Sequence, residues 1–350
     1  MVGTHDLRDL IQNGQTVEGF GEERAFEYVR RWIDAHNRRY GDMVASLMTV
    51  TTDRDVAYGG QGSTDEMFEV NEYGAAPAQK TQFAPEKVSL PLRKFQFNVG
   101  FTRDFIRRRT VGDLTRVVLN TADADIKTLY RELRRALFIP TNYTWRDIFV
   151  DRLPLEVKRL VNGDGQPVPA FETASFNAAT HTHYLASTAW TNAAIDAAIS
   201  HVREHGYTGQ IRVKINAANY GDVAALTKFT PAPKDLLRYG ADQTIANVGS
   251  QAGAPDDNRI IGVWDGQYYV ETKPWMPASY LFVNDVQGPR PLSLRYNPLI
   301  GNGLFLAATN ESYPLRADVS ERYFGIGVSE RLNGAVTFVG GSTYTAPVIS

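Results

Sequence analysis

A stripe of apolar residues through the middle of the chain predicts one long helix over residues 111–138. Its side chains recur at steps of three or four, the spacing of one helix face; they are Leu114, Val118, Ala122, Ile126, Leu129, Leu133 and Leu137. Thr110 and Asp113 have capping-box spacing, and Pro140 follows the far end. This helix would be ~42 Å long at about 1.5 Å per residue. It predicts an elongated molecule, with a surface helix of an ordinary large domain as the alternative.

The stretch before this helix predicts a long arm. Residues 87–101 alternate apolar and polar positions, with a slip after Pro91 that predicts a bulge or bend. Residues 53–86 are rich in glycine and polar residues and offer few side chains to pack. A long segment without its own core is uncommon inside a compact domain. We therefore expect residues 46–101 to form a two-stranded arm held by contacts outside itself.

The remaining chain alternates shorter helices and strands. A helix is predicted over 22–40, where Gly41 would end it. In the second half we predict helices over 191–205 and 216–228, strands over 211–215, 280–283, 322–328 and 335–339, and a hairpin over 260–270 through Asp265-Gly266. Residues 141–188 are irregular, and residues 240–258 are a polar loop. The last strands would rejoin the sheet beside the long helix, which makes residues 189–310 an insertion.

Composition excludes several classes of function. The 350 residues are 43% hydrophobic and 22% charged, which is ordinary for a globular protein. With no long apolar run and no basic-then-apolar start, we expect neither a membrane span nor a secretion signal. The absence of cysteine excludes disulfides and thiolate chemistry. A net charge of −2 gives no general attraction to nucleic acid, so any DNA contact would be local.

One pentapeptide carries an enzymatic signal. Residues 201–205 match the His-x-x-Glu-His pattern of inverted zinc peptidases, in which two histidines four positions apart can meet one metal. His181 and His183 could add ligands. The motif also lies in the last turn before Gly206, where imidazoles interact with exposed helix carbonyls. We expect His201, Glu204 and His205 to hold no catalytic metal, and we keep a zinc-dependent hydrolase as a minor alternative.

Other candidate sites are weaker. Gly60-Gln61-Gly62 lacks the third glycine and the strand-to-helix context of a dinucleotide site. A basic cluster, Arg103 with 107–109, is flanked by acidic residues, so a salt-bridge network is favoured over a phosphate site. We therefore expect no catalytic, cofactor-binding or metal-binding residues and no enzyme activity.

Three stretches, taken with the order of elements, carry a family likeness: KVSLPLRKFQFNVGFTRDFI, THTHYLASTAWTNAAIDAAISHVREHGY and RADVSERYFGIGVSERLNGAV. In these the chain resembles the major capsid proteins of tailed bacteriophages, whose fold is shared with encapsulin shells and herpesvirus capsid floors. The resemblance implies an α+β fold. Its parts would be an N-terminal arm and helix (1–45), an extended loop (46–101), a peripheral domain with a spine helix at 111–138 (102–188), an axial domain (189–310) and a return to the peripheral domain (311–350).

The same resemblance implies a structural role. Hexamers and pentamers would tile an icosahedral shell around double-stranded DNA, which is held non-specifically, and the extended loop would lie on the adjacent subunit. Scaffold, portal and decoration proteins are the further partners implied, with assembly in the bacterial cytoplasm, a final place in the virion and no membrane. In some members a lysine of the loop is cross-linked to an asparagine of the peripheral domain, and Lys80 and Asn333 are the candidates for such a pair in this chain. An encapsulin-type compartment around an enzyme cargo is the alternative within the fold.

Overall fold

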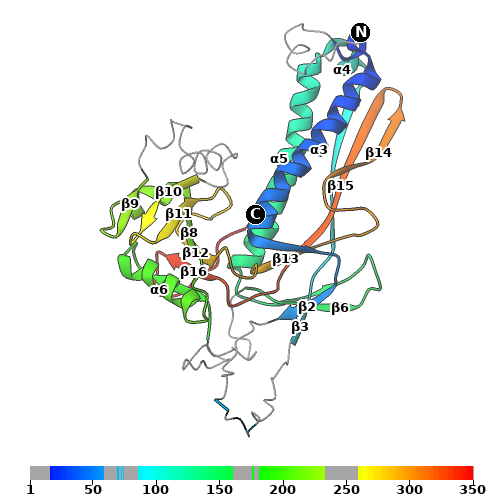
Figure 1. The fold of residues 1–350 in the computed structure, drawn as a ribbon. Coiled ribbons are helices and arrows are strands. Elements are labelled where there is room, and N and C mark those ends of the chain that lie inside the picture. The colour runs from blue at the N-terminus through cyan, green and yellow to red at the C-terminus, as the bar shows by residue number, and fades with distance from the viewer. Residues whose placement is uncertain are drawn as a thin grey trace.

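Two sheets organise the chain in the computed structural model, which describes residues 16–58, 69–70, 72, 74, 86–160, 176, 181–232 and 259–349. The first sheet has the order β1-β13-β15-β14, with β4 also paired to β15. The second sheet has the order β7-β16-β12-β8-β11-β10-β9. Figure 1 shows α3 and α5 side by side along the first sheet, whereas the second sheet forms a separate lobe with α6.

The elements follow the chain in this order. The helices are α2 (Val17–Phe20), α3 (Glu22–Leu47), α4 (Arg103–Arg108), α5 (Val111–Phe138), α6 (Asn192–Arg203), the 3-10 turn η1 (Ala217–Asn219) and α7 (Tyr220–Ala224). The strands are β1 (Met48–Thr51), β2 (Asp55–Tyr58), β3 (Glu86–Ser89), β4 (Arg93–Thr102), β5 (Tyr143–Arg146), β6 (Pro154–Val157), β7 (Tyr184–Ser187), β8 (Ile211–Ile215), β9 (Phe229–Pro231), β10 (Arg259–Trp264), β11 (Tyr268–Thr272), β12 (Tyr280–Asp285), β13 (Leu292–Tyr296), β14 (Phe305–Ser312), β15 (Leu315–Val328) and β16 (Ala335–Val339).

The long helix is confirmed as α5, with the predicted bounds and capping box. The backbone N–H of Asp113 donates to the Thr110 hydroxyl at 3.3 Å, and the N–H of Thr110 donates to the Asp113 carboxylate at 3.3 Å. The apolar stripe is buried at Leu129, Leu133 and their neighbours, where it meets β13 and β15 in the main core. Ile126 is only half-buried at the edge of that core. Burial of this stripe explains why the helix lies along the first sheet.

The predicted stop of the N-terminal helix at Gly41 is wrong, because α3 continues to Leu47. A glycine inside a helix costs only about 1 kcal/mol relative to alanine. Contacts on both sides of it outweigh that cost: Asn37 exchanges two hydrogen bonds with the backbone of Leu304, and Leu47 is buried in the main core. Tertiary packing therefore carries the helix through the glycine.

The two-stranded arm is not paired over its whole predicted length. Among the described strands of residues 46–101, only β2 and β3 pair with each other. β1 pairs in parallel with β13, and β4 pairs along its length with β15, so both ends of residues 46–101 belong to the first sheet. The predicted bend is confirmed between β3 and β4, where Leu90, Pro91 and Leu92 are buried. The sequence alternation predicted the strands correctly but could not specify their partners.

The late strands divide between the two sheets. β15 lies beside α5 in the first sheet, as predicted, but β16 joins the second sheet between β7 and β12. Conversely, β13 lies within residues 189–310 yet belongs to the first sheet. The second sheet therefore includes strands from outside residues 189–310, and the first sheet includes a strand from inside them. The second sheet and α6 enclose their own core, whose fully buried residues include Ile195, Val213 and Trp264.

The hairpin through Asp265-Gly266 is confirmed as β10 and β11, with positive φ angles of 48° and 67° at the two turn residues. Such a turn favours this residue pair because glycine and aspartate tolerate the left-handed region. The helix predicted after Asn216 is shorter than expected and ends at Ala224. The polar loop 240–258, Gly60-Gln61-Gly62 and Lys80 lie outside the described residues. None of the described helices is both long enough and apolar enough to cross a membrane.

Candidate functional site

Four histidines gather where α6 ends beside the start of β7. Thr191 caps α6 by accepting from the Ala194 N–H at 3.1 Å, and the buried face of the helix packs in the core of the second lobe. This packing fixes the C-terminal end of α6, where His201 lies in the last turn and His205 follows the helix. His181 and His183 lie just before β7, which pairs with β16. The site therefore joins two segments of the second lobe.

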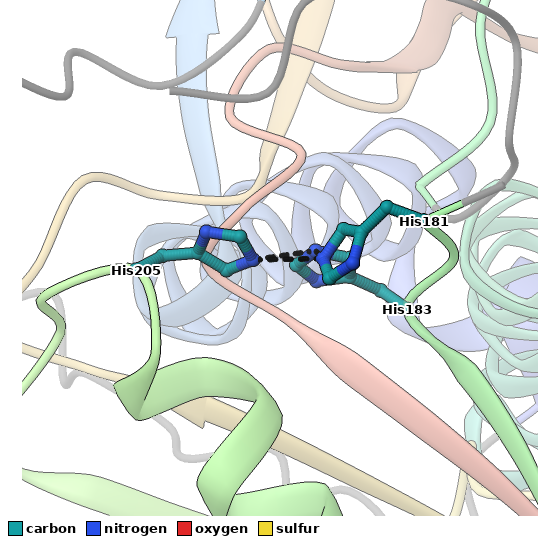
Figure 2. Close-up of side chains that lie close together, drawn as sticks. All are labelled: His181, His183 and His205. Carbon is teal, nitrogen blue, oxygen red and sulfur yellow. Dashed lines mark hydrogen bonds between the residues drawn. The ribbon is translucent and has the colours of Figure 1, made fainter. Parts of the chain in front are cut away.

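Three of these imidazoles converge on one point, as Figure 2 shows. The Nε2 atoms of His181 and His183 are 3.1 Å apart, those of His181 and His205 are 3.1 Å apart, and those of His205 and His183 are 2.9 Å apart. His183 and His205 are buried, and His181 is partly buried. We call these three residues the histidine triangle.

The fourth histidine, His201, makes a hydrogen bond outside the triangle. The Nε2–H of His201 donates to the backbone carbonyl of Thr182 at 2.8 Å, and its Nδ1 lies 3.4 Å from Glu204 Oε1. Glu204 Oε1 also lies 3.5 Å from His181 Nε2 and 3.7 Å from His205 Nε2. It makes no hydrogen bond in the described structure. One carboxylate oxygen thus borders the triangle.

Burial controls the charge of the cluster. It lowers the pKa of His181 to about 4, with a further contribution from the charges of His201 and Arg331. Burial likewise lowers the pKa of His205 to about 3 and that of His183 well below its usual value, with neighbouring histidines adding to both shifts. Burial raises the pKa of Glu204, against the opposing effect of His201. At neutral pH the triangle is therefore uncharged, with nitrogen lone pairs available.

The structure does not bring together the histidine pair of the minor zinc-hydrolase alternative. Among the described residues, the groups spaced to hold an ion are His181, His183 and His205, and an overlapping set of His181, His201 and Glu204. His201 and His205 do not occur together in either group. Local sequence spacing missed the triangle, although the concentration of histidines over residues 181–205 was the signal that could have indicated it.

Two arginines of the basic cluster, Arg103 and Arg107, form ion pairs within the subunit. Arg103 lies 3.0 Å from Glu22 and 3.8 Å from Glu311, and Arg107 lies 3.9 Å from Glu18. These contacts join α4 to the N-terminal helices and to β14. They support the predicted salt-bridge network over a phosphate site.

Asn333 is not placed for the cross-link that the resemblance implied. Its side chain is fully buried, and its amide donates to the carbonyls of Asp285 at 2.8 Å and Pro289 at 2.7 Å. Its Oδ1 accepts from the N–H of Asp285 at 2.8 Å. With its polar groups used inside the subunit, Asn333 is closed to a lysine from a neighbour.

A surface feature that the sequence did not predict lies between β5 and β6. Residues 147–153, here called the apolar turn, expose Ile148 (53%), Val150 (60%) and Leu153 (51%) to solvent. The turn is rigidly supported. The N–H of Asp147 donates to the Leu153 carbonyl at 3.0 Å, and its fully buried carboxylate accepts from Arg295 at 2.9 Å. A well-anchored turn that presents apolar side chains to water is typical of a contact surface.

The apolar turn also adjoins the base of the β2–β3 hairpin. Arg54, just before β2, donates to Asp151 of the turn at 2.6 Å, and β3 contacts β6. Figure 1 shows β2, β3 and β6 together at one end of the molecule, away from α4. The remaining arm and the apolar turn therefore form one edge of the subunit.

Known structures match the chain, although no protein-family model and no curated protein sequence does. A chain of Mycobacterium phage Patience superposes with a TM-score of 0.63 and 20% identity, over 99% of this chain and 96% of that chain. The capsid of an empty GTA particle matches with a TM-score of 0.48 and 14% identity, over 85% of this chain and 89% of that chain. The mature capsid of bacteriophage PhiM1 matches with a TM-score of 0.46 and 10% identity, over 84% and 85% of the two chains.

The match to the phage Patience chain extends over almost the whole length of both proteins. The chain therefore has an α+β fold of the major capsid type found in tailed phages. This finding confirms the fold class that the sequence resemblance implied.

Proposed function

We propose that this protein is a shell-forming structural subunit, the major capsid protein of a phage or prophage, and not an enzyme. The observation that carries the proposal is the whole-length fold match to a phage chain. Hexamers and pentamers of the subunit would close an icosahedral shell around double-stranded DNA. Scaffold, portal and decoration proteins are its expected further partners, and the virion is its expected location.

The shape of the subunit supports a place in a thin shell. Helix α5 has 28 residues and β15 has 14, so both are more than ~40 Å long at about 1.5 and 3.3 Å per residue. They run alongside each other, and α3 lies beside α5 along the same sheet (Figure 1). Such a long layer offers extended edges to neighbouring copies, whereas a compact enzyme domain buries most of its elements around one centre.

The apolar turn supports contact between copies of the chain. Large side chains exposed on a supported turn gain free energy when a partner covers them. The turn adjoins the β2–β3 hairpin, and this hairpin belongs to the proposed extended loop. We propose that this edge of the subunit lies against an adjacent copy.

The domain assignment is part of the same proposal. The first sheet with α5 corresponds to the peripheral domain, predicted at residues 102–188 and 311–350. The second sheet with α6 corresponds to the axial domain, predicted at residues 189–310. We extend the axial domain to include β7 and β16 and return β13 to the peripheral domain, because that is how the strands pair. The N-terminal arm and helix stay at residues 1–45. Of the extended loop predicted at 46–101, β1 and β4 pair in the first sheet, so the β2–β3 hairpin is the described part that remains outside it.

Assembly of the purified protein tests the proposal. We expect light scattering over a concentration series to detect pentamers, hexamers or closed particles, because the exposed apolar edge is buried only on neighbours. Electron microscopy should then show shells. A protein that stays a monodisperse monomer at tens of micromolar, under all salt and crowding conditions, would contradict the proposal. At such concentrations even weak association, with a binding free energy of about 5 to 8 kcal/mol, is detected.

The contents of the particles separate the two kinds of shell. A phage capsid is expected to protect nucleic acid from nuclease. The nucleic acid that remains in the particles after nuclease treatment is measured by the ratio of absorbance at the nucleic-acid and protein maxima. Particles from the same host that instead contain one co-purifying enzyme would indicate an encapsulin-type compartment. Both results keep the shell function, and only the first supports DNA packaging.

A further inference from the structure

We infer that the histidine triangle binds a divalent cation of the zinc type, with Glu204 as its fourth ligand, and that the ion is structural. This site replaces the expectation of no metal at these residues, and it differs from the His-x-x-Glu-His reading in using His181 and His183 in place of His201. The inference goes beyond the proposed shell function and does not depend on it.

The spacing of the triangle fits a tetrahedral ion. Zinc lies about 2.0–2.1 Å from imidazole nitrogen, so two nitrogens of a tetrahedral site are about 3.3 Å apart. The three Nε2 separations of 2.9–3.1 Å are close to that value. Glu204 Oε1 lies 3.5 Å from His181 Nε2 and 3.7 Å from His205 Nε2, on the border of the triangle. To become the fourth ligand, the Glu204 side chain would turn from its present position beside His181 and His201 toward the centre of the triangle.

The protons of the triangle cannot satisfy its contacts without an ion. His183 donates from Nδ1 to the carbonyl of Gly334 at 2.9 Å, so the Nε2 of the neutral ring carries a lone pair. Each remaining Nε2–H can be directed at only one neighbour, so at most two of the three nitrogen contacts can be hydrogen bonds. A cation that accepts three lone pairs resolves the remaining repulsion.

The surroundings have the features of a metal site. The His183 hydrogen bond to Gly334 holds the ring in the tautomer that a metal requires, as outer-shell partners commonly do. Glu204 Oε1 and His205 Nδ1 are buried atoms without hydrogen-bond partners. The Glu204 carboxylate supplies one negative charge beside the triangle, which offsets part of the charge of a dication.

Burial indicates a structural and not a hydrolytic ion. His183 and His205 are 4% and 8% exposed. The ring of Phe176 packs against His181 and His205 with centroid separations of 4.6 Å. With four protein ligands the ion keeps no open position for water, which a catalytic zinc needs. Its effect would be to fasten the start of β7 to the end of α6 and the entry to β16.

Cobalt(II) titration of the untagged full-length protein, after treatment with a chelator, tests the site. We expect the strong visible absorption of four-coordinate cobalt, saturating at one ion per chain. Zinc should displace the cobalt and raise the unfolding temperature, because the assembled site exists only in the folded protein. Elemental analysis of native protein provides an independent measure of bound metal.

Matched variants distinguish the triangle from the sequence motif. His181→Ala should abolish the cobalt spectrum, a loss greater than the roughly 10- to 100-fold weakening caused by removing an outer partner. His201→Gln is the control: its amide can still donate to Thr182, and we expect its spectrum to be unchanged.

Two results would overturn the inference. The first is native protein without stoichiometric metal that also gives no four-coordinate cobalt spectrum. The second is loss of metal in His201→Gln equal to that in His181→Ala, which would move the site to His181, His201 and Glu204. Since removal of a structural ion can unfold a variant, the titration and elemental analysis of the unmodified chain decide the matter if His181→Ala is insoluble.

Discussion

Replacing Leu133 with aspartate is expected to leave the subunit misfolded and insoluble. Leu133 is fully buried in the main core, where α5 meets β13 and β15. An unpaired carboxylate at this position costs several kcal/mol, a large part of the roughly 5–15 kcal/mol that stabilises a typical domain. Circular dichroism and the soluble fraction after expression measure the effect.

The same helix provides the controls. Leu119 is 41% exposed, so Leu119→Asp should change stability little. Ile126 is half-buried, and Ile126→Asp should fall between the two. Equal solubility of all three variants would mean that the apolar stripe of α5 does not form the core.

This gradient shows what the sequence could and could not predict about α5. Periodicity and the Thr110–Asp113 capping box are local, so the helix and its ends were predictable to the residue. The depth at which each stripe residue is buried depends on strands almost two hundred positions away, such as β15. Ile126 and Leu133 are therefore equivalent in the sequence pattern and different in the structure.

Strand pairing was the main part of the fold that the sequence did not determine. The Asp265-Gly266 hairpin was predictable because its turn is local. β4 alternates clearly and β16 is a short apolar run, but nothing in their residues specifies β15 and β12 as their partners. The family resemblance predicted an order of domains, and it did not predict that β13 pairs in the first sheet or that β7 and β16 pair in the second.

The histidine site shows the same division between local and distant information. The spacing of His201 and His205 suggested the zinc-hydrolase alternative, because residues four apart share a helix face. In the structure, the carbonyl of Thr182 accepts from His201, and His205 meets His181 and His183 instead. Which groups the two histidines contact depends on how β7 lies against the end of α6, and no local sequence pattern contains that information.

The apolar turn is expected to be required for assembly and not for folding. In the double variant Ile148→Asp with Val150→Asp, both carboxylates remain in water in the isolated subunit, since these side chains are 53% and 60% exposed. The unfolding temperature should therefore change by only a few degrees, in line with the roughly 0.5 kcal/mol typical of surface substitutions. In the shell, a neighbouring copy would have to bury both charges without partners, at a cost of several kcal/mol per contact. We expect small oligomers in place of particles.

Thermal unfolding followed by circular dichroism, with size-exclusion chromatography and electron microscopy, separates folding from assembly in this variant. The conservative pair Ile148→Val with Val150→Ile keeps the turn apolar and should still form particles. Normal shells from the aspartate variant would show that the turn faces solvent in the assembly. Unfolding of that variant would instead show that the turn supports the subunit itself, through the Asp147–Arg295 pair beneath it. A folded subunit that no longer forms shells is the result that assigns the turn to the contact between copies.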